Sequence, residues 1–129
     1  MSTFNKSILV VEDDPSFSEA LRDSLVNAGF SVVLAARFSE ALHKTNNQRF
    51  SCILMDLQLE TGSGLQAIQL IRKGTAKEGL NYETPIILMS GHLEADIIKA
   101  AAGKVQAVMA KPFNTESILA KVKELTAKD

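Results

Sequence analysis

The sequence has one cysteine and no tryptophan among its 129 residues. One thiol forms no disulfide within the chain, so the composition suits a reducing compartment. Cys52 lies inside an apolar run, where a buried structural thiol is expected. No stretch approaches the roughly 20 apolar residues of a membrane span, and the first residues lack the apolar core of a signal peptide. We therefore expect a cytoplasmic protein with no membrane contact.

An excess of either charge is also missing, because 14 basic and 15 acidic side chains give a net charge of −1. Nucleic-acid surfaces usually carry a basic excess, so we expect no nucleic acid to bind this chain. The 46% hydrophobic and 22% charged content is ordinary for a globular protein. No low-complexity or linker-like segment interrupts the chain, so residues 1–129 are predicted to form a single domain.

Short apolar runs of strand length recur along the chain and alternate with longer amphipathic stretches. The predicted strands are Ile8–Val11, Ser31–Leu34, Cys52–Met55, Pro85–Met89 and Val105–Ala110. Near-continuous apolar runs are typical of parallel strands buried on both faces. The alternation predicts an α/β fold with right-handed crossovers, in which helices cover both faces of the sheet.

The amphipathic stretches predict five helices. Their ranges are 16–28, Glu40–Gln48, Leu65–Ile71, Glu94–Ala102, and a last helix capped by Asn114 or Thr115. Ser16 and Glu19 have the spacing of a capping box at the first of these, and Gly103 is expected to end the fourth. Residues 74–84, from Gly74 to Thr84, are rich in glycine and polar residues and are predicted to form a surface loop.

Acidic side chains follow two of the apolar runs. Glu12, Asp13 and Asp14 come directly after the first run, and Asp56 comes after the third. Taken alone, each group is equally well explained as a solvated turn, with one acid stabilising a helix start. Parallel strands open their carboxyl ends onto one edge of the sheet, so we expect the carboxylates to meet there. Such a cluster repels itself unless a hard cation binds, and oxygen ligands favour Mg²⁺.

Two further polar groups follow the fourth and fifth runs at the same edge. Ser90 comes after the fourth run and Lys111 after the fifth. Each would be unremarkable alone, as a turn hydroxyl or a solvated ammonium. Beside the carboxylates, Lys111 is expected to bind a phosphoryl oxygen as a point charge, and Ser90 to supply one hydrogen bond. A carboxylate next to Mg²⁺ can attack phosphorus and form an acyl phosphate.

Four segments together carry a family resemblance: residues 8–15, residues 55–57 with Gly64 and Leu65, residues 85–91, and residues 111–113. With these segments the chain resembles a response-regulator receiver domain, the CheY-like phosphoacceptor of two-component signalling. The resemblance implies a flavodoxin-like, doubly wound, five-stranded parallel sheet of order 2-1-3-4-5 with five helices. It also implies a cis peptide bond before Pro112.

The resemblance assigns roles to the site residues. Asp56 would be the phosphorylated aspartate, and Ser90 and Lys111 would bind the phosphoryl group. Asp14 would be an additional, structural acid. Mg²⁺ would be held by Asp13 directly, by Glu12 mainly through water, by Asp56, and by the backbone carbonyl of Gln58.

The implied function is that of a Mg²⁺-dependent phosphoacceptor in a two-component system or phosphorelay. A histidine kinase or histidine phosphotransfer protein would supply the phosphoryl group, and phosphorylation would change contacts with a downstream protein. Such a domain promotes its own phosphorylation and dephosphorylation only, so it is not a turnover enzyme. The face made by the fourth helix, fifth strand and fifth helix would be a candidate homodimer interface.

Several positions depart from the family pattern. Val108 stands where the family usually has Tyr or Phe, so the aromatic part of the switch is missing. Glu60 stands where many receivers have Pro, and residues 60–64 are expected to form a more flexible loop. His43 and His92 are expected to be exposed. The departures leave open an alternative, a phosphorylation-independent pseudo-receiver that acts as an interaction module.

Residues 62–67 match the G-x-G-x-x-A pattern of nucleotide-binding folds. They do not lie in the first strand–helix turn, and no suitable acid follows at the expected distance. A flavodoxin-type nucleotide-binding protein is therefore a distant third hypothesis.

Overall fold

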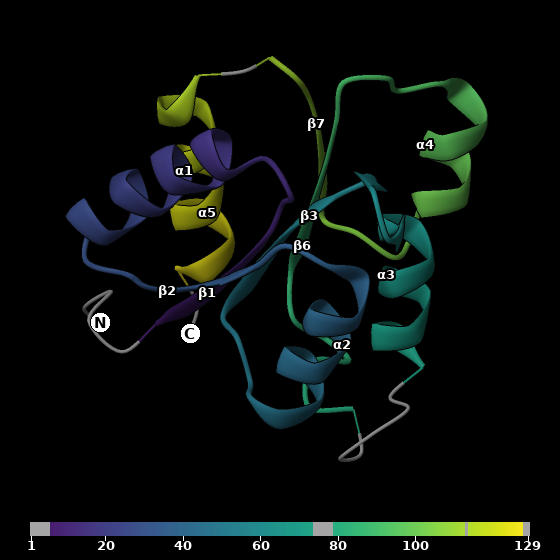
Figure 1. Ribbon diagram of the computed structural model, residues 1–129, viewed down its shortest axis with the longest axis horizontal. Helices are drawn as coiled ribbons and strands as arrows, with labels where there is room; N and C mark the ends of the chain where they lie inside the picture. Colours follow the sequence, from purple (N-terminus) through teal and green to yellow (C-terminus); the bar gives the residue numbers. More distant parts are fainter. Residues whose placement is uncertain (1–5, 74–78, 113, 128–129) are drawn as a thin grey trace.

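The computed structural model describes residues 6–73, 79–112 and 114–127. Its main sheet is parallel, in the order β2-β1-β3-β6-β7 (Figure 1). The strands are β1 (Ser7–Val11), β2 (Ser31–Ala35), β3 (Cys52–Asp56), β6 (Ile86–Ser90) and β7 (Ala107–Ala110). Because β6 and β7 are the fourth and fifth strands of this sheet, the predicted order 2-1-3-4-5 is confirmed.

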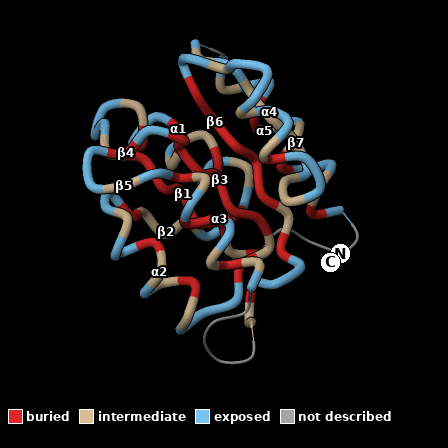
Figure 2. The backbone as a smooth tube through the Cα atoms, turned by 90° about the vertical axis from the view of Figure 1, so that its right-hand side faces the viewer, coloured by how far each residue is buried: buried red, intermediate tan, exposed pale blue. Residues whose placement is uncertain are grey.

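Helices cover both faces of the sheet, as the alternating pattern predicts. The helices within the described residues are α1 (Pro15–Asn27), α2 (Phe38–Asn47), α3 (Gly64–Arg72), α4 (Ala95–Ala101) and α5 (Thr115–Thr126). Helices α1 and α5 pack on one face, and α2, α3 and α4 pack on the other (Figure 1). Strands β3 and β6 are buried along their whole length between these layers (Figure 2). None of the described helices is long and apolar enough to cross a membrane.

The residues that cap the first turns of α1 and α5 decide two predictions made from the sequence. The side chain of Asp14, not Ser16, caps α1 by accepting a hydrogen bond from Ser16 N at 3.1 Å. Pro15 then occupies the first helical position, where its missing N–H costs nothing, so the predicted capping box is wrong. At α5, Asn114 is the cap, and its Oδ1 accepts from Ser117 N at 2.7 Å.

The last strand of the sheet is shorter than predicted, since β7 begins at Ala107 and not at Val105. Gln106, just before it, uses its side-chain Oε1 to accept from Ile86 N at 2.7 Å. Gly103 has a φ of +80°, a left-handed conformation that glycine adopts without strain, and it lies in the turn after α4 as predicted.

A short antiparallel hairpin includes most of the segment that the sequence predicts to be a flexible loop, residues 60–64. It pairs β4 (Gln58–Leu59) with β5 (Gly62–Ser63). A Cβ on Gly64 would lie 2.1 Å from the Asp56 carbonyl oxygen, and one on Gly62 would lie 2.8 Å from the Phe38 ring. Close packing therefore accounts for both glycines of the G-x-G-x-x-A pattern.

The predicted surface loop contains a buried polar centre. Residues 74–78 lie outside the described residues, but Asn81 and Thr84 are buried, so the prediction is wrong for these two. Asn81 Nδ2 donates to the carbonyls of Thr45 and Gln48, each at 2.8 Å. Its Oδ1 accepts from Phe50 N and from Thr84 Oγ1, each at 2.9 Å. The side chain thus joins the end of α2 to the segments that precede β3 and β6.

Replacing Asn81 with Ala is expected to lower the free energy of unfolding by about 3 kcal/mol, because buried donors and acceptors lose their partners. Urea unfolding followed by far-ultraviolet circular dichroism measures the change. The control is Asn47→Ala, since Asn47 is exposed and its side chain donates to the His43 carbonyl one helical turn earlier. The control should stay within about 0.5 kcal/mol of the parent. Equal effects in the two variants would contradict a structural role for Asn81.

Candidate functional site

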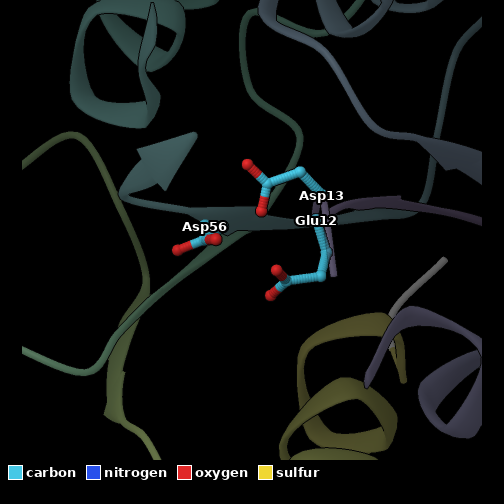
Figure 3. A group of neighbouring side chains, drawn as sticks. All are labelled: Glu12, Asp13 and Asp56. Carbon is cyan, nitrogen blue, oxygen red and sulfur yellow. The ribbon is translucent and has the colours of Figure 1, made fainter. Parts of the chain in front are cut away.

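Three carboxylates meet at the carboxyl ends of β1 and β3. Glu12 and Asp13 follow β1, and Asp56 is the last residue of β3. One oxygen from each lies within 4.8 Å of the others, and the three side chains face a common space (Figure 3). The register of the sheet places them there, because Val11 pairs with Met55 in the neighbouring strand. The structure therefore brings together three of the four acids that the strand-tip pattern singles out, all except Asp14.

The environments of the three acids differ. Glu12 and Asp56 are only 3% and 4% exposed, whereas Asp13 is half-buried. Burial raises the pKa of Glu12, although hydrogen bonds from Lys111 and from the Asp14 backbone N–H act in the opposite direction. Carboxylates that are this close and this poorly hydrated need a compensating cation.

Lys111 supplies one positive charge to the cluster. Its Nζ lies 2.6 Å from Glu12 Oε1 and 3.5 Å from Asp56 Oδ2, and it stands 4.8 Å from the centre of the Phe17 ring. Burial works against the ammonium, but the hydrogen bond to Glu12 and the nearby carboxylate charges outweigh it and raise the pKa of Lys111. The lysine therefore stays charged and bridges β7 to the acidic tips of β1 and β3.

Ser90 ends β6, beside β3 in the sheet, where Met89 pairs with Asp56. Its side chain is fully buried, and its Oγ accepts a hydrogen bond from His92 N at 3.0 Å. Its carbonyl accepts from Lys111 N at 2.7 Å, which ties the tips of β6 and β7 together. The side chains of His92 and His43 are exposed, as predicted.

The remaining features that the sequence predicts for the site are Gln58, Asp14, the peptide bond before Pro112, and Val108. Gln58 is exposed at the start of β4, and its N–H donates to Asp56 Oδ1 at 3.2 Å. Asp14 caps α1, which confirms its structural role. The peptide bond between Lys111 and Pro112 is cis, as predicted, and Phe113 of the same motif lies outside the described residues. Val108 lies half-buried in β7, against the apolar core beneath α2, α3 and α4.

The donor set of this site is chemically well defined. It offers carboxylate oxygens from three residues, and oxygen-only sites of this kind favour hard cations such as Mg²⁺. An ammonium next to these oxygens suits an anionic group with several oxygens, such as a phosphoryl group. The arrangement fits a metal-assisted transfer of a phosphoryl group to a carboxylate.

Comparison with known proteins identifies the family. A family model described as the response regulator receiver domain matches residues 8–123. The chain belongs to this family, and the predicted resemblance is confirmed.

One curated relative is the acid tolerance regulatory protein ActR of Rhizobium meliloti, which is 31% identical over 117 residues. That alignment covers 90% of this chain and 57% of the relative. The chain spans about half the length of the curated relatives it matches.

Solved receiver domains share the fold. A CheY-like receiver domain protein from Methanospirillum hungatei is 26% identical with a TM-score of 0.87, covering 96% of this chain and 95% of that one. The receiver domain of the sensor histidine kinase PA1611 from Pseudomonas aeruginosa is 28% identical with a TM-score of 0.78, covering 95% and 98%. The latter was solved with magnesium coordinated in its active-site cleft. Together with the cluster of three carboxylates in this chain, this finding supports the predicted magnesium cofactor.

Two contacts at the site were not anticipated from the sequence. Asp13 Oδ2 accepts a hydrogen bond from Glu60 N at 2.8 Å, and Thr61 Oγ1 accepts one from Phe38 N at 2.9 Å. Both come from the turn of the β4–β5 hairpin. The first of these contacts had one hint in the sequence. Position 60 is not proline, so its residue carries a backbone N–H that can donate a hydrogen bond.

Proposed function

We propose that this chain accepts a phosphoryl group on Asp56 in a Mg²⁺-dependent reaction and thereby changes its contacts with other proteins. The observation that carries the proposal is the convergence of Glu12, Asp13 and Asp56 at two adjacent strand tips, with Lys111 paired to two of them. Bound Mg²⁺ would neutralise carboxylate and phosphoryl oxygens and align them for in-line displacement.

The residues of the chain divide the reaction between them. An oxygen of Asp56 forms the new bond to phosphorus, while the bond from phosphorus to the donor's imidazole nitrogen breaks and that nitrogen keeps the electron pair. Asp13, Asp56 and the Gln58 carbonyl would hold the metal directly, and Glu12 would act mainly through water. Lys111 and Ser90 would bind oxygens of the transferred group, which requires the Lys111 ammonium to turn partly away from Glu12.

The donor in this proposal is the phosphohistidine of a histidine kinase or a histidine phosphotransfer protein. The chain would promote its own phosphorylation and dephosphorylation and no other turnover. After phosphorylation, the added charge would draw Ser90 and its loop inward and shift the adjacent face formed by α4, β7 and α5. That face includes Ile98, which is 47% exposed, and would meet a downstream protein or a second copy.

Intact-mass measurement after incubation with acetyl phosphate tests the proposal directly. With Mg²⁺ we expect one labile phosphoryl adduct, and with excess chelator we expect none, because the carboxylates then repel the incoming anion. Fluorescence quenching is not an option for this assay, since the chain has no tryptophan.

The same measurement separates the main proposal from its alternative. A second candidate function, a phosphorylation-independent interaction module, is favoured by Val108, because a half-buried valine lacks the swing of an aromatic side chain. If no adduct forms and calorimetry detects no Mg²⁺ binding, the interaction module replaces the phosphoacceptor as the better explanation.

A further inference from the structure

The β4–β5 hairpin links the carboxylate cluster to the start of α2. At its turn, Glu60 N donates to Asp13 Oδ2 at 2.8 Å, across 47 positions of sequence. Glu60 is exposed, and its contact with Asp13 is made by its backbone N–H. This donor would be lost with proline at position 60, since proline has no N–H.

The hairpin is also held in place by contacts with the start of α2. Thr61 Oγ1 accepts a hydrogen bond from Phe38 N at 2.9 Å, which satisfies a backbone donor at the first residue of α2. The backbone of Gly62 packs so closely on the Phe38 ring that an added Cβ would lie 2.8 Å from it. Gly64 N also donates to the Leu57 carbonyl at 2.8 Å and closes the base of the segment.

A hydrogen bond of this kind fixes the direction of a carboxylate. Each carboxylate oxygen has two lone pairs, so one donor on Oδ2 leaves acceptor capacity on both oxygens of Asp13 for a cation. With its rotation restricted, Asp13 keeps an oxygen within 4.8 Å of those of Glu12 and Asp56. The carboxylate therefore need not lose rotational freedom when the metal arrives.

We propose that the Glu60 N–H is a positioning group for Asp13, which raises the affinity of the site for Mg²⁺, and that Thr61 holds it in place by anchoring the hairpin to α2. The inference rests on the proposed magnesium site and deepens it, because it assigns a metal-orienting role to a backbone group outside the ligand set. Outer hydrogen bonds to metal ligands commonly change metal affinity by about 10- to 100-fold.

The decisive comparison is Glu60→Pro against Glu60→Ala, with Mg²⁺ affinity measured by isothermal titration calorimetry. Proline removes the N–H, whereas alanine removes the same side chain and keeps the N–H. We expect Glu60→Pro to raise the Kd for Mg²⁺ about tenfold and Glu60→Ala to leave it within about twofold of the parent. Equal Kd values for the parent and the proline variant would overturn the inference, and so would equal weakening by proline and alanine.

A second pair of variants decides the question if Glu60→Pro does not fold. Thr61→Val removes the acceptor for Phe38 N, and Thr61→Ser retains a hydroxyl at that position. We expect the valine variant to bind Mg²⁺ about threefold to tenfold more weakly, and the serine variant to restore the affinity of the parent. Unchanged affinity in the valine variant would reject the role of Thr61 as the anchor.

The hydrogen bond itself can be followed without a metal. Amide hydrogen exchange read by nuclear magnetic resonance should show faster exchange at Glu60 in Asp13→Ala than in the parent, with the amides of β3 unchanged. A parent protein that binds no Mg²⁺ would reject the proposed site and the inference together. A parent that binds Mg²⁺, with an affinity that Glu60→Pro leaves unchanged, would reject the inference alone.

Discussion

Replacing Asp56 with Asn is expected to remove the phosphoryl adduct completely. The amide has no charged oxygen to attack phosphorus, so the acyl phosphate cannot form. The variant should still fold, because asparagine has almost the same shape and its Oδ1 can keep the hydrogen bond from Gln58 N, which is 3.2 Å long in the parent. Intact mass after incubation with acetyl phosphate and Mg²⁺ measures the loss, and far-ultraviolet circular dichroism checks the fold.

Asp14→Asn is a matched control for this experiment. It makes the same chemical change two positions from Glu12, but at an exposed helix cap outside the carboxylate cluster. Asparagine and aspartate cap helices about equally well, so neither the fold nor the adduct should change. An adduct that persisted in Asp56→Asn would show that another residue accepts the phosphoryl group. Loss of the adduct in both variants would show that the assay does not report on Asp56.

Replacing Lys111 with Met is expected to lower the free energy of unfolding by about 3 kcal/mol in the presence of a chelator. Removing one partner of a buried ion pair leaves the other charge uncompensated, which commonly costs about 3–5 kcal/mol. The Glu12 side chain is only 1% exposed, and that of Lys111 is 24% exposed, so we expect the lower end of this range. Methionine keeps much of the apolar stem of lysine, which limits the loss of packing. Urea unfolding followed by circular dichroism gives the value.

Added Mg²⁺ provides an internal check on the cause. A dication bound to the carboxylates would replace the missing charge, so the difference between Lys111→Met and the parent should shrink in excess Mg²⁺. The control Lys121→Met removes an exposed pair with Glu124 and should change stability by less than about 1 kcal/mol. A Lys111 variant as stable as the parent in chelator would mean that Glu12 is protonated or hydrated there without its partner.

The fold was predictable because the strand signals are local. The runs at residues 8–11 and 52–55 are apolar on both faces, which favours central parallel strands, and both strands were found where they were predicted. The acids at their ends then had to meet, since parallel strands share one carboxyl edge. The weakest boundaries fell where a distant group decides the local structure, as at α2, which begins at Phe38 and not at Glu40, with Phe38 N bonded to Thr61.

Polar contacts between distant segments escaped prediction for a different reason. The polar residues of the loop before β6 predicted an exposed turn, yet Asn81 is 2% exposed, because the end of α2 and the backbone of Phe50 supply hydrogen-bond partners for both polar atoms of its side chain. Such an assignment depends on the positions of backbone groups about 30 residues away, which no local pattern of polarity records.

By itself the sequence determined the alternating α/β fold, the edge at which the site lies, and the identity of the residues that meet there. Those features follow from the periodicity of apolar residues and from the geometry that all parallel sheets share. Only the tertiary structure decided how the charges pair, with Lys111 bonded to Glu12 and Asp13 held by the backbone of Glu60. These contacts join residues 99 and 47 positions apart, and their geometry is set by the packing of the hairpin and the strand tips.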